Sequence, residues 1–82
     1  MMKIQTLDRI KKGHHCIIRQ IPSGEIRAQA IRFNLIEGNT AICQEIIPAG
    51  PIIIKIGRQE IALGRKLAQQ IKVEETGYET TS

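Results

Sequence analysis

The residues best suited to metal or nucleophilic chemistry are the run His14-His15-Cys16 and a second cysteine, Cys43. In an extended strand neighbouring side chains point to opposite faces, so His14 and Cys16 would share one face and His15 would take the other. Two ligands do not complete a zinc site, although Cys43 could join them from another strand. We therefore expect no bound metal. Both cysteines are expected to be buried, unbonded core residues, since free cysteine is among the most buried residue types.

Enzymatic chemistry is not expected of this chain. A cysteine nucleophile needs a base, an orienting group and a pocket, and a chain of 82 residues has a small core that leaves little space for a pocket. The glycines are scattered and do not form the Gly-x-x-x-x-Gly-Lys pattern that cradles phosphate groups. The carboxylates are sparse and do not pair at a catalytic spacing. We expect neither catalysis nor a cofactor.

The formal net charge of +4 is unevenly distributed along the chain. Glu74, Glu75 and Glu79 lie near the C-terminus with no Lys or Arg after Lys72, so the body of the chain is more basic than the total. A basic body favours an acidic protein surface, nucleic acid or another anionic surface. Small barrels that bind single-stranded nucleic acid also stack bases on aromatic side chains, and this chain has only one Phe and one Tyr. A protein partner is therefore expected, with nucleic acid as an alternative.

The absence of long apolar stretches predicts a cytoplasmic protein. No uninterrupted apolar stretch is longer than Ile52–Ile54, whereas a spanning helix needs about 20 apolar residues. The first residues, Met1–Ile10, include three charged side chains and no apolar stretch long enough for a signal peptide. We expect no membrane insertion, and we expect both cysteines to stay reduced in the cytosol.

The core must be built mainly from isoleucine, because the chain has no Trp and few other aromatic residues. Isoleucine is β-branched and favours strands. We expect an opening element over 6–13, strands over 14–21, 40–47, 52–56, 59–63 and 71–73, a helix over 25–33 and one helical turn over 65–70. Short strands separated by Gly and Pro turns indicate a mainly β fold, a small closed barrel of about five antiparallel strands with one α-helix and a short helical turn.

The predicted helix carries one apolar stripe. Ile26, Ala30 and Phe33 fall at i, i+4 and i+7, which places them on one face. Arg27 lies away from this stripe. Asn34 fits the position that follows a helix, because Asn tolerates the left-handed conformation that ends helices.

Four stretches of the chain, taken in order, resemble the motifs of a known family. They are LDRIKKG at 7–13, FNLIEG at 33–38, PAGPI at 48–52 and IALGRKLAQQIKV at 61–73. The first is similar to an apolar-rich opening closed by glycine, and the last to a closing pattern of Ile-Ala-Leu, a polar turn, Ala and a final Ile-x-Val. In their order and spacing they resemble the FeoA family, small cytosolic proteins that accompany the FeoB ferrous iron transporter.

The resemblance covers residues 6–73 and implies an SH3-like barrel with a helix across one mouth. It also implies a non-catalytic role in ferrous iron uptake, in which the chain docks on the cytosolic part of a FeoB-type transporter and modulates it. Three positions depart from the family pattern. Gln29 stands where the family often has Arg, Ala30 where it often has Leu, and Asn34 where Gly is usual. The first two changes alter the helix face, so a partner surface there would differ.

Basic residues at two turns are the first candidates for contact with the partner. They are Lys55 and Arg58 near the third hairpin, and Arg65 and Lys66 near the closing turn; Arg27 on the helix face is a further candidate. Turns on a rigid scaffold often display functional side chains. Two alternatives to a transporter accessory are a free-standing regulatory module resembling the C-terminal domain of iron-dependent repressors, and a small basic barrel that binds nucleic acid.

The chain is expected to contain one domain, over residues 1–75. The remaining residues, 76–82, are polar and terminal, so we expect them to form a disordered tail.

Overall fold

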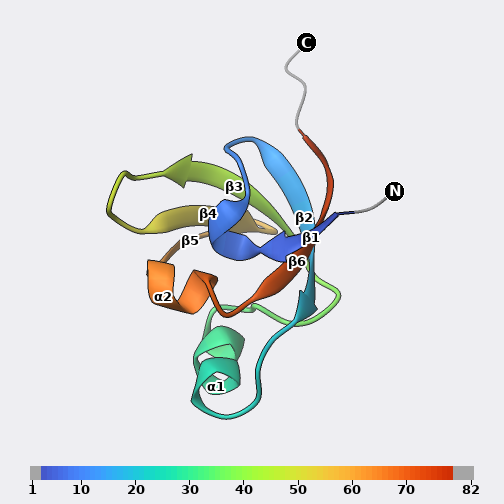
Figure 1. The fold of residues 1–82 in the computed structure, drawn as a ribbon, viewed down its shortest axis with the longest axis vertical. Coiled ribbons are helices and arrows are strands. Elements are labelled where there is room, and N and C mark those ends of the chain that lie inside the picture. Colours follow the sequence, from blue (N-terminus) through green and yellow to red (C-terminus); the bar gives the residue numbers. More distant parts are fainter. Residues whose placement is uncertain (1–2, 79–82) are drawn as a thin grey trace.

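Six strands, two α-helices and one 3₁₀ turn make up the part of the chain that the computed structural model describes, residues 3–78 (Figure 1). In chain order they are β1 (Lys3–Thr6), η1 (Leu7–Arg9), β2 (His14–Gln20), α1 (Glu25–Arg32), β3 (Thr40–Ile46), β4 (Ile52–Ile56), β5 (Gln59–Leu63), α2 (Arg65–Ala68) and β6 (Lys72–Tyr78).

The strands form one antiparallel sheet with the hydrogen-bonded order β1-β6-β2-β3-β4-β5. The sheet is strongly bent, and in Figure 1 β3 and β4 cross the view at a steep angle to β2 and β6. The first and last strands are neighbours, with Lys3 opposite Glu75. The strands at the two ends of the described chain therefore pair with each other.

Isoleucine alternation builds the interior of this sheet. In β4, Ile52 and Ile54 are buried whereas Ile53 between them is partly exposed. This is the period of two that a strand with one buried face requires. The buried apolar residues are Leu7, Ile10, Cys16, Ile18, Ile21, Ala30, Leu35, Ala41, Cys43, Ile52, Ile54, Ile61, Leu63, Leu67, Ala68, Ile71 and Val73.

The helix α1 lies at one end of the barrel, and its C-terminus is fixed into the core (Figure 1). The N–H of Asn34 donates to the carbonyl of Ile31, and the N–H of Leu35 donates to the carbonyl of Ala30. These are the two bonds of a Schellman motif. Asn34 has φ 63°, as the sequence predicted for this position. Leu35 and Ala30 are both fully buried, so the end of the helix is anchored by packing as well as by hydrogen bonds.

The turn η1 and the helix α2 contact each other on another side of the barrel. The N–H of Leu7 donates to the carbonyl of Ile71 at 2.8 Å. Leu7, Leu67, Ala68 and Ile71 are all buried. Ile10, which follows η1, is buried as well.

Two strand boundaries correct the expectations from the sequence. The strand β1 was not predicted, because no Gly or Pro separates it from η1. The last strand was expected over 71–73, but β6 begins at Lys72 and extends to Tyr78, since it pairs with both β1 and β2. Residues 76–78, which were assigned to the tail, therefore belong to β6. The rest of the predicted tail, 79–82, lies outside the described residues.

Candidate partner-binding surfaces

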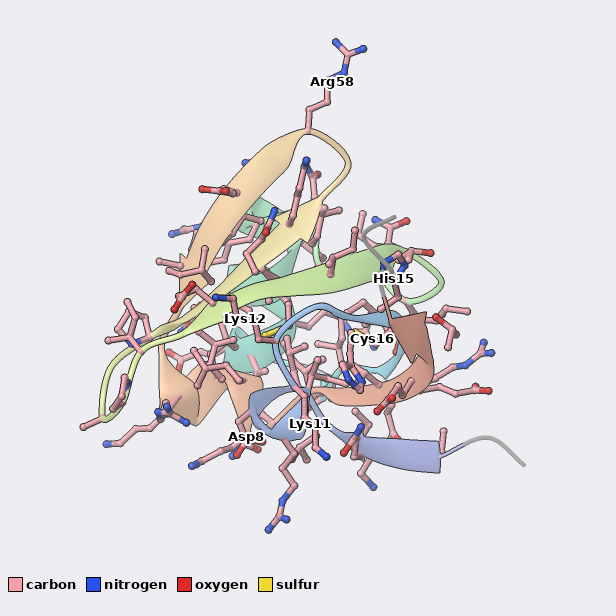
Figure 2. All side chains as sticks on the ribbon, turned by 90° about the horizontal axis from the view of Figure 1, so that it is seen from above. Asp8, Lys11, Lys12, His15, Cys16 and Arg58 are labelled. Atoms are coloured by element: carbon pink, nitrogen blue, oxygen red, sulfur yellow. The ribbon has the colours of Figure 1, made fainter. Side chains whose placement is uncertain are left out.

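The run His14-His15-Cys16 opens β2, and its side chains have different surroundings (Figure 2). Cys16 is buried, whereas the ring Nδ1 of His14 lies 2.6 Å from Glu75 Oε2 on β6. The other carboxylate oxygen of Glu75 accepts a hydrogen bond from Gln5 Nε2 at 3.1 Å. Within residues 3–78, no group of three or more His, Cys, Asp or Glu side chains is arranged to hold a metal ion.

Both cysteines face the core, as the sequence predicted. Cys16 and Cys43 are each 1% exposed, and both are free. Burial, and after it the neighbouring Cys43, raises the pKa of Cys16 to about 12. Burial also raises the pKa of Cys43. Because the thiolate is the reactive form of cysteine, both side chains are weak nucleophiles near neutral pH.

Arg65, a predicted contact residue, has an intramolecular role in the structure. Its Nε donates to the carbonyl of Gly50 at 2.9 Å and its Nη2 donates to the carbonyl of Ile47 at 3.0 Å. These bonds tie the start of α2 to the loop between β3 and β4. A Cβ at Gly50 would lie 2.8 Å from Ile47 Cγ2, so the loop is tightly turned at this point.

Arg27, the candidate on the helix face, is engaged in a similar way. Its Nη2 donates to Glu37 Oε2 at 3.0 Å and to the carbonyl of Ile21 at 2.8 Å. Glu37 also accepts a hydrogen bond from the backbone N–H of Ile21. The Arg27 bond, followed by the Ile21 bond, lowers the pKa of the exposed Glu37 carboxyl below its usual value. This network joins α1 to the segments on either side of it.

The other three basic candidates are displayed at separate places. Arg58 is exposed at the tip of the β4–β5 hairpin and projects away from the barrel (Figure 2). Lys55 is partly exposed on β4, opposite Glu60 in the strand register. Lys66 is exposed on α2. The hairpin tip and α2 lie at opposite ends of β5, so Arg58 and Lys66 do not share one patch.

Exposed isoleucines beside α1 were not predicted as a candidate surface. Ile31 is 53% exposed and Ile36 is 46% exposed. Ile31 lies off the apolar stripe of α1. This position off the stripe was the sequence signal that could have predicted its exposure. Between them, Asn34 Nδ2 donates to Gln59 Oε1 at 3.0 Å, so the end of α1 is bonded to the β4–β5 hairpin.

An ion pair between a half-exposed arginine and a buried glutamate was also missed. Glu74 is only 5% exposed, and its Oε1 lies 2.6 Å from Arg19 Nε. Its Oε2 is buried without a hydrogen-bond donor among the described residues. The sequence pattern had grouped Glu74 with the terminal acidic residues, whereas the structure places it inside the sheet.

Comparison with solved structures defines the class of protein. A crystal structure of an iron uptake regulatory protein (FeoA) matches with a TM-score of 0.85 and 29% identity, over 90% of this chain and 100% of that chain. The solution structure of iron(II) transport protein A from Clostridium thermocellum matches with a TM-score of 0.82 and 27% identity, over 88% of this chain and 46% of that chain. The predicted fold, a small SH3-like barrel, is confirmed.

A more distant match shows the fold alone. The manganese-activated repressor ScaR in its apo form has a TM-score of 0.78 and 24% identity, over 88% of this chain and 35% of that chain. This chain therefore spans less than half the length of ScaR and of the Clostridium thermocellum protein. A search of curated proteins found no match.

Comparison of the sequence with models of protein families identifies the family of this chain. Residues 5–75 match the model of the FeoA domain. Because this match covers most of the chain, the chain belongs to the FeoA domain family, as its motifs suggested. Among residues 3–78, no helix is long and apolar enough to cross a membrane.

Proposed function

We propose that this chain is a non-catalytic accessory protein of ferrous iron uptake, which docks on the cytosolic part of a FeoB-type transporter and modulates it. The observation that carries the proposal is the FeoA domain match over residues 5–75. The similar chain described as an iron uptake regulatory protein, covered over its full length at 29% identity, gives further support.

The surface of the barrel is suited to binding a protein. Arg58 is an exposed cation at the tip of the β4–β5 hairpin and Lys66 is an exposed cation on α2, while Lys55 lies partly exposed on β4. Exposed charges of one sign attract an oppositely charged partner and raise the association rate. The two thiols, which would be the best nucleophiles, are buried and protonated, so binding is favoured over covalent chemistry.

Modulation requires a difference in affinity between two states of the transporter. A bound protein shifts a conformational equilibrium only by the ratio of its affinities for the two conformations. The FeoA-like domain would therefore bind one state of the transporter more tightly than the other, and its presence would raise the population of that state.

Binding to the soluble cytosolic domain of the FeoB-type transporter from the same organism tests the proposal. Wild type should bind, and Arg58→Glu should slow association and flatten its dependence on salt. Lys66→Glu tests the second turn in the same way. Arg65 is left unchanged, because its guanidinium holds the β3–β4 loop and a substitution there would alter the fold. If wild type does not bind at physiological salt, the proposal is wrong.

A second candidate is a regulatory module that contacts a DNA-binding protein, because a manganese-activated repressor contains this fold over 35% of its chain. In that case the chain would bind a repressor and not the transporter domain. Affinity capture with each of the two partners, side by side, distinguishes these functions.

A further inference from the structure

The C-terminal end of α1 and the tip of the β4–β5 hairpin lie next to each other. The side-chain hydrogen bond from Asn34 to Gln59 joins the two elements at 3.0 Å. Arg58 directly precedes Gln59 and projects outward from the hairpin (Figure 2). Ile31 and Ile36 lie on the two sides of Asn34 in the chain, so this bond places the segment that carries them next to the hairpin that carries Arg58.

We name this region the α1–hairpin surface and define it by Ile31, Arg32, Ile36 and Arg58. The apolar stripe of α1 faces the core, where Ala30 is fully buried, so the isoleucines of the surface are left for solvent. Single exposed apolar residues are normal. Here two of the four large exposed hydrophobic residues among the described residues flank Asn34, whose side chain bonds the hairpin.

The α1–hairpin surface carries uncompensated positive charge. Its two arginines are exposed, and no ion pair among residues 3–78 holds either of them. Two acidic residues close in sequence to this surface, Glu37 and Glu60, each lie opposite another basic residue. Glu37 binds Arg27 at 3.0 Å, and Glu60 lies opposite Lys55 in the β4–β5 register. A complementary partner therefore needs apolar side chains with carboxylates beside them, the common pattern of an apolar interface centre with a polar rim.

We propose that the α1–hairpin surface binds an acidic amphipathic segment of the transporter's cytosolic part, with its apolar side chains on Ile31 and Ile36 and its carboxylates on Arg32 and Arg58. This assignment rests on the proposed function, because it names the surface through which that docking occurs. It differs from a purely electrostatic contact at the turns, since the isoleucines supply the slow dissociation and the arginines supply the fast association.

The test compares two double variants with matched controls, using the soluble cytosolic domain of the transporter as the probe. Ile31→Ser with Ile36→Ser should weaken affinity by about tenfold or more, mainly through faster dissociation. Arg32→Glu with Arg58→Glu should slow association and flatten its salt dependence. The controls are Ile47→Ser, an exposed isoleucine on the β3–β4 loop, and Lys11→Glu, an exposed lysine between η1 and β2. Each control should bind within about twofold of wild type.

The binding results decide whether the α1–hairpin surface is the docking site. If both double variants bind like wild type while their melting temperatures are unchanged, the surface assignment is overturned and the proposed function stands. If wild type itself does not bind the domain, the proposed function fails and the occupant named here fails with it.

Two further measurements separate other occupants. Sedimentation equilibrium that shows a dimer in wild type, and a monomer in Ile31→Ser with Ile36→Ser, would assign the surface to a second copy. Loss of binding to phosphatidylglycerol vesicles in the same variant would assign it to lipid. Either result overturns the proposal.

Discussion

At the scale of single residues, the buried Cys16 thiol makes stability depend on alkaline pH. Its pKa is about 12 in the folded protein against an ordinary value of 9.0. Between these values the unfolded chain loses the thiol proton while the folded chain keeps it, so the free energy of unfolding falls as pH rises. The stability that depends on a protonated Cys16 is fully present below about pH 9 and is lost as pH rises above it.

This prediction is tested by urea unfolding of wild type and Cys16→Ala at about pH 8 and about pH 10.5. Wild type should lose more stability over this interval, by up to about 1.4 kcal/mol per pH unit. Groups that do not interact with Cys16 titrate alike in both proteins and cancel in the difference, and repeating the comparison with Cys43→Ala in both proteins removes the interacting thiol. Equal losses in the two proteins would show that Cys16 is not protected from ionisation.

A second residue-scale prediction concerns Arg65. Replacing it by Ala removes both hydrogen bonds to the β3–β4 loop, and we expect a loss of about 1–3 kcal/mol in the free energy of unfolding. Its neighbour Lys66 is exposed, so Lys66→Ala should change stability by less than about 0.5 kcal/mol. Chemical denaturation of both variants is the measurement. A loss for Arg65→Ala as small as for Lys66→Ala would contradict the role given to the guanidinium.

At the scale of elements, the end of α1 depends on one backbone conformation. Asn34 has φ 63°, a region that costs an alanine roughly 1 kcal/mol and a glycine almost nothing. We predict that Asn34→Gly is about 1 kcal/mol more stable than Asn34→Ala. Both variants lose the side-chain bond to Gln59, so thermal unfolding of the pair isolates the backbone term. Equal melting temperatures would mean that the Schellman motif rearranges.

The elements that were predictable from the sequence are those with local signals. The isoleucines of 52–56 and the two-residue turn at 57–58 locate β4 and β5, whose observed bounds equal the expected ones. The left-handed Asn34 was likewise readable from its own residue type. Roles that depend on distant partners were not. Arg65 bonds Gly50 across 15 positions, and Arg19 binds Glu74 across 55 positions. No local pattern marks such residues, so a basic side chain at a turn was interpreted as free for a partner.

At the scale of the whole molecule, the extended β6 changes the expected effect of truncation. The sequence alone predicted a disordered tail over residues 76–82, and removal of such a tail would leave stability nearly unchanged. In the structure Gly77 and Tyr78 pair with His15 and His14. Truncation after Glu75 should therefore lower the free energy of unfolding by about 1–3 kcal/mol, through lost strand hydrogen bonds.

The matched control is truncation after Tyr78, which keeps β6 complete and should change stability by less than about 0.5 kcal/mol. Urea unfolding of the two truncated proteins gives both values. If the two truncated proteins have identical stability, residues 76–78 do not stabilise the domain, and its boundary lies at residue 75, as the sequence suggested.

The pairing of β1 with β6 has a consequence for synthesis of the chain. Lys3 must meet Glu75, so the barrel cannot be completed until the last strand is available. On a ribosome, where the N-terminus emerges first, the local β4–β5 hairpin can form early. The strand β1, however, must wait with its edge unpaired until β6 has left the exit tunnel. Nascent chains of this protein are therefore expected to need protection at β1 until β6 has emerged.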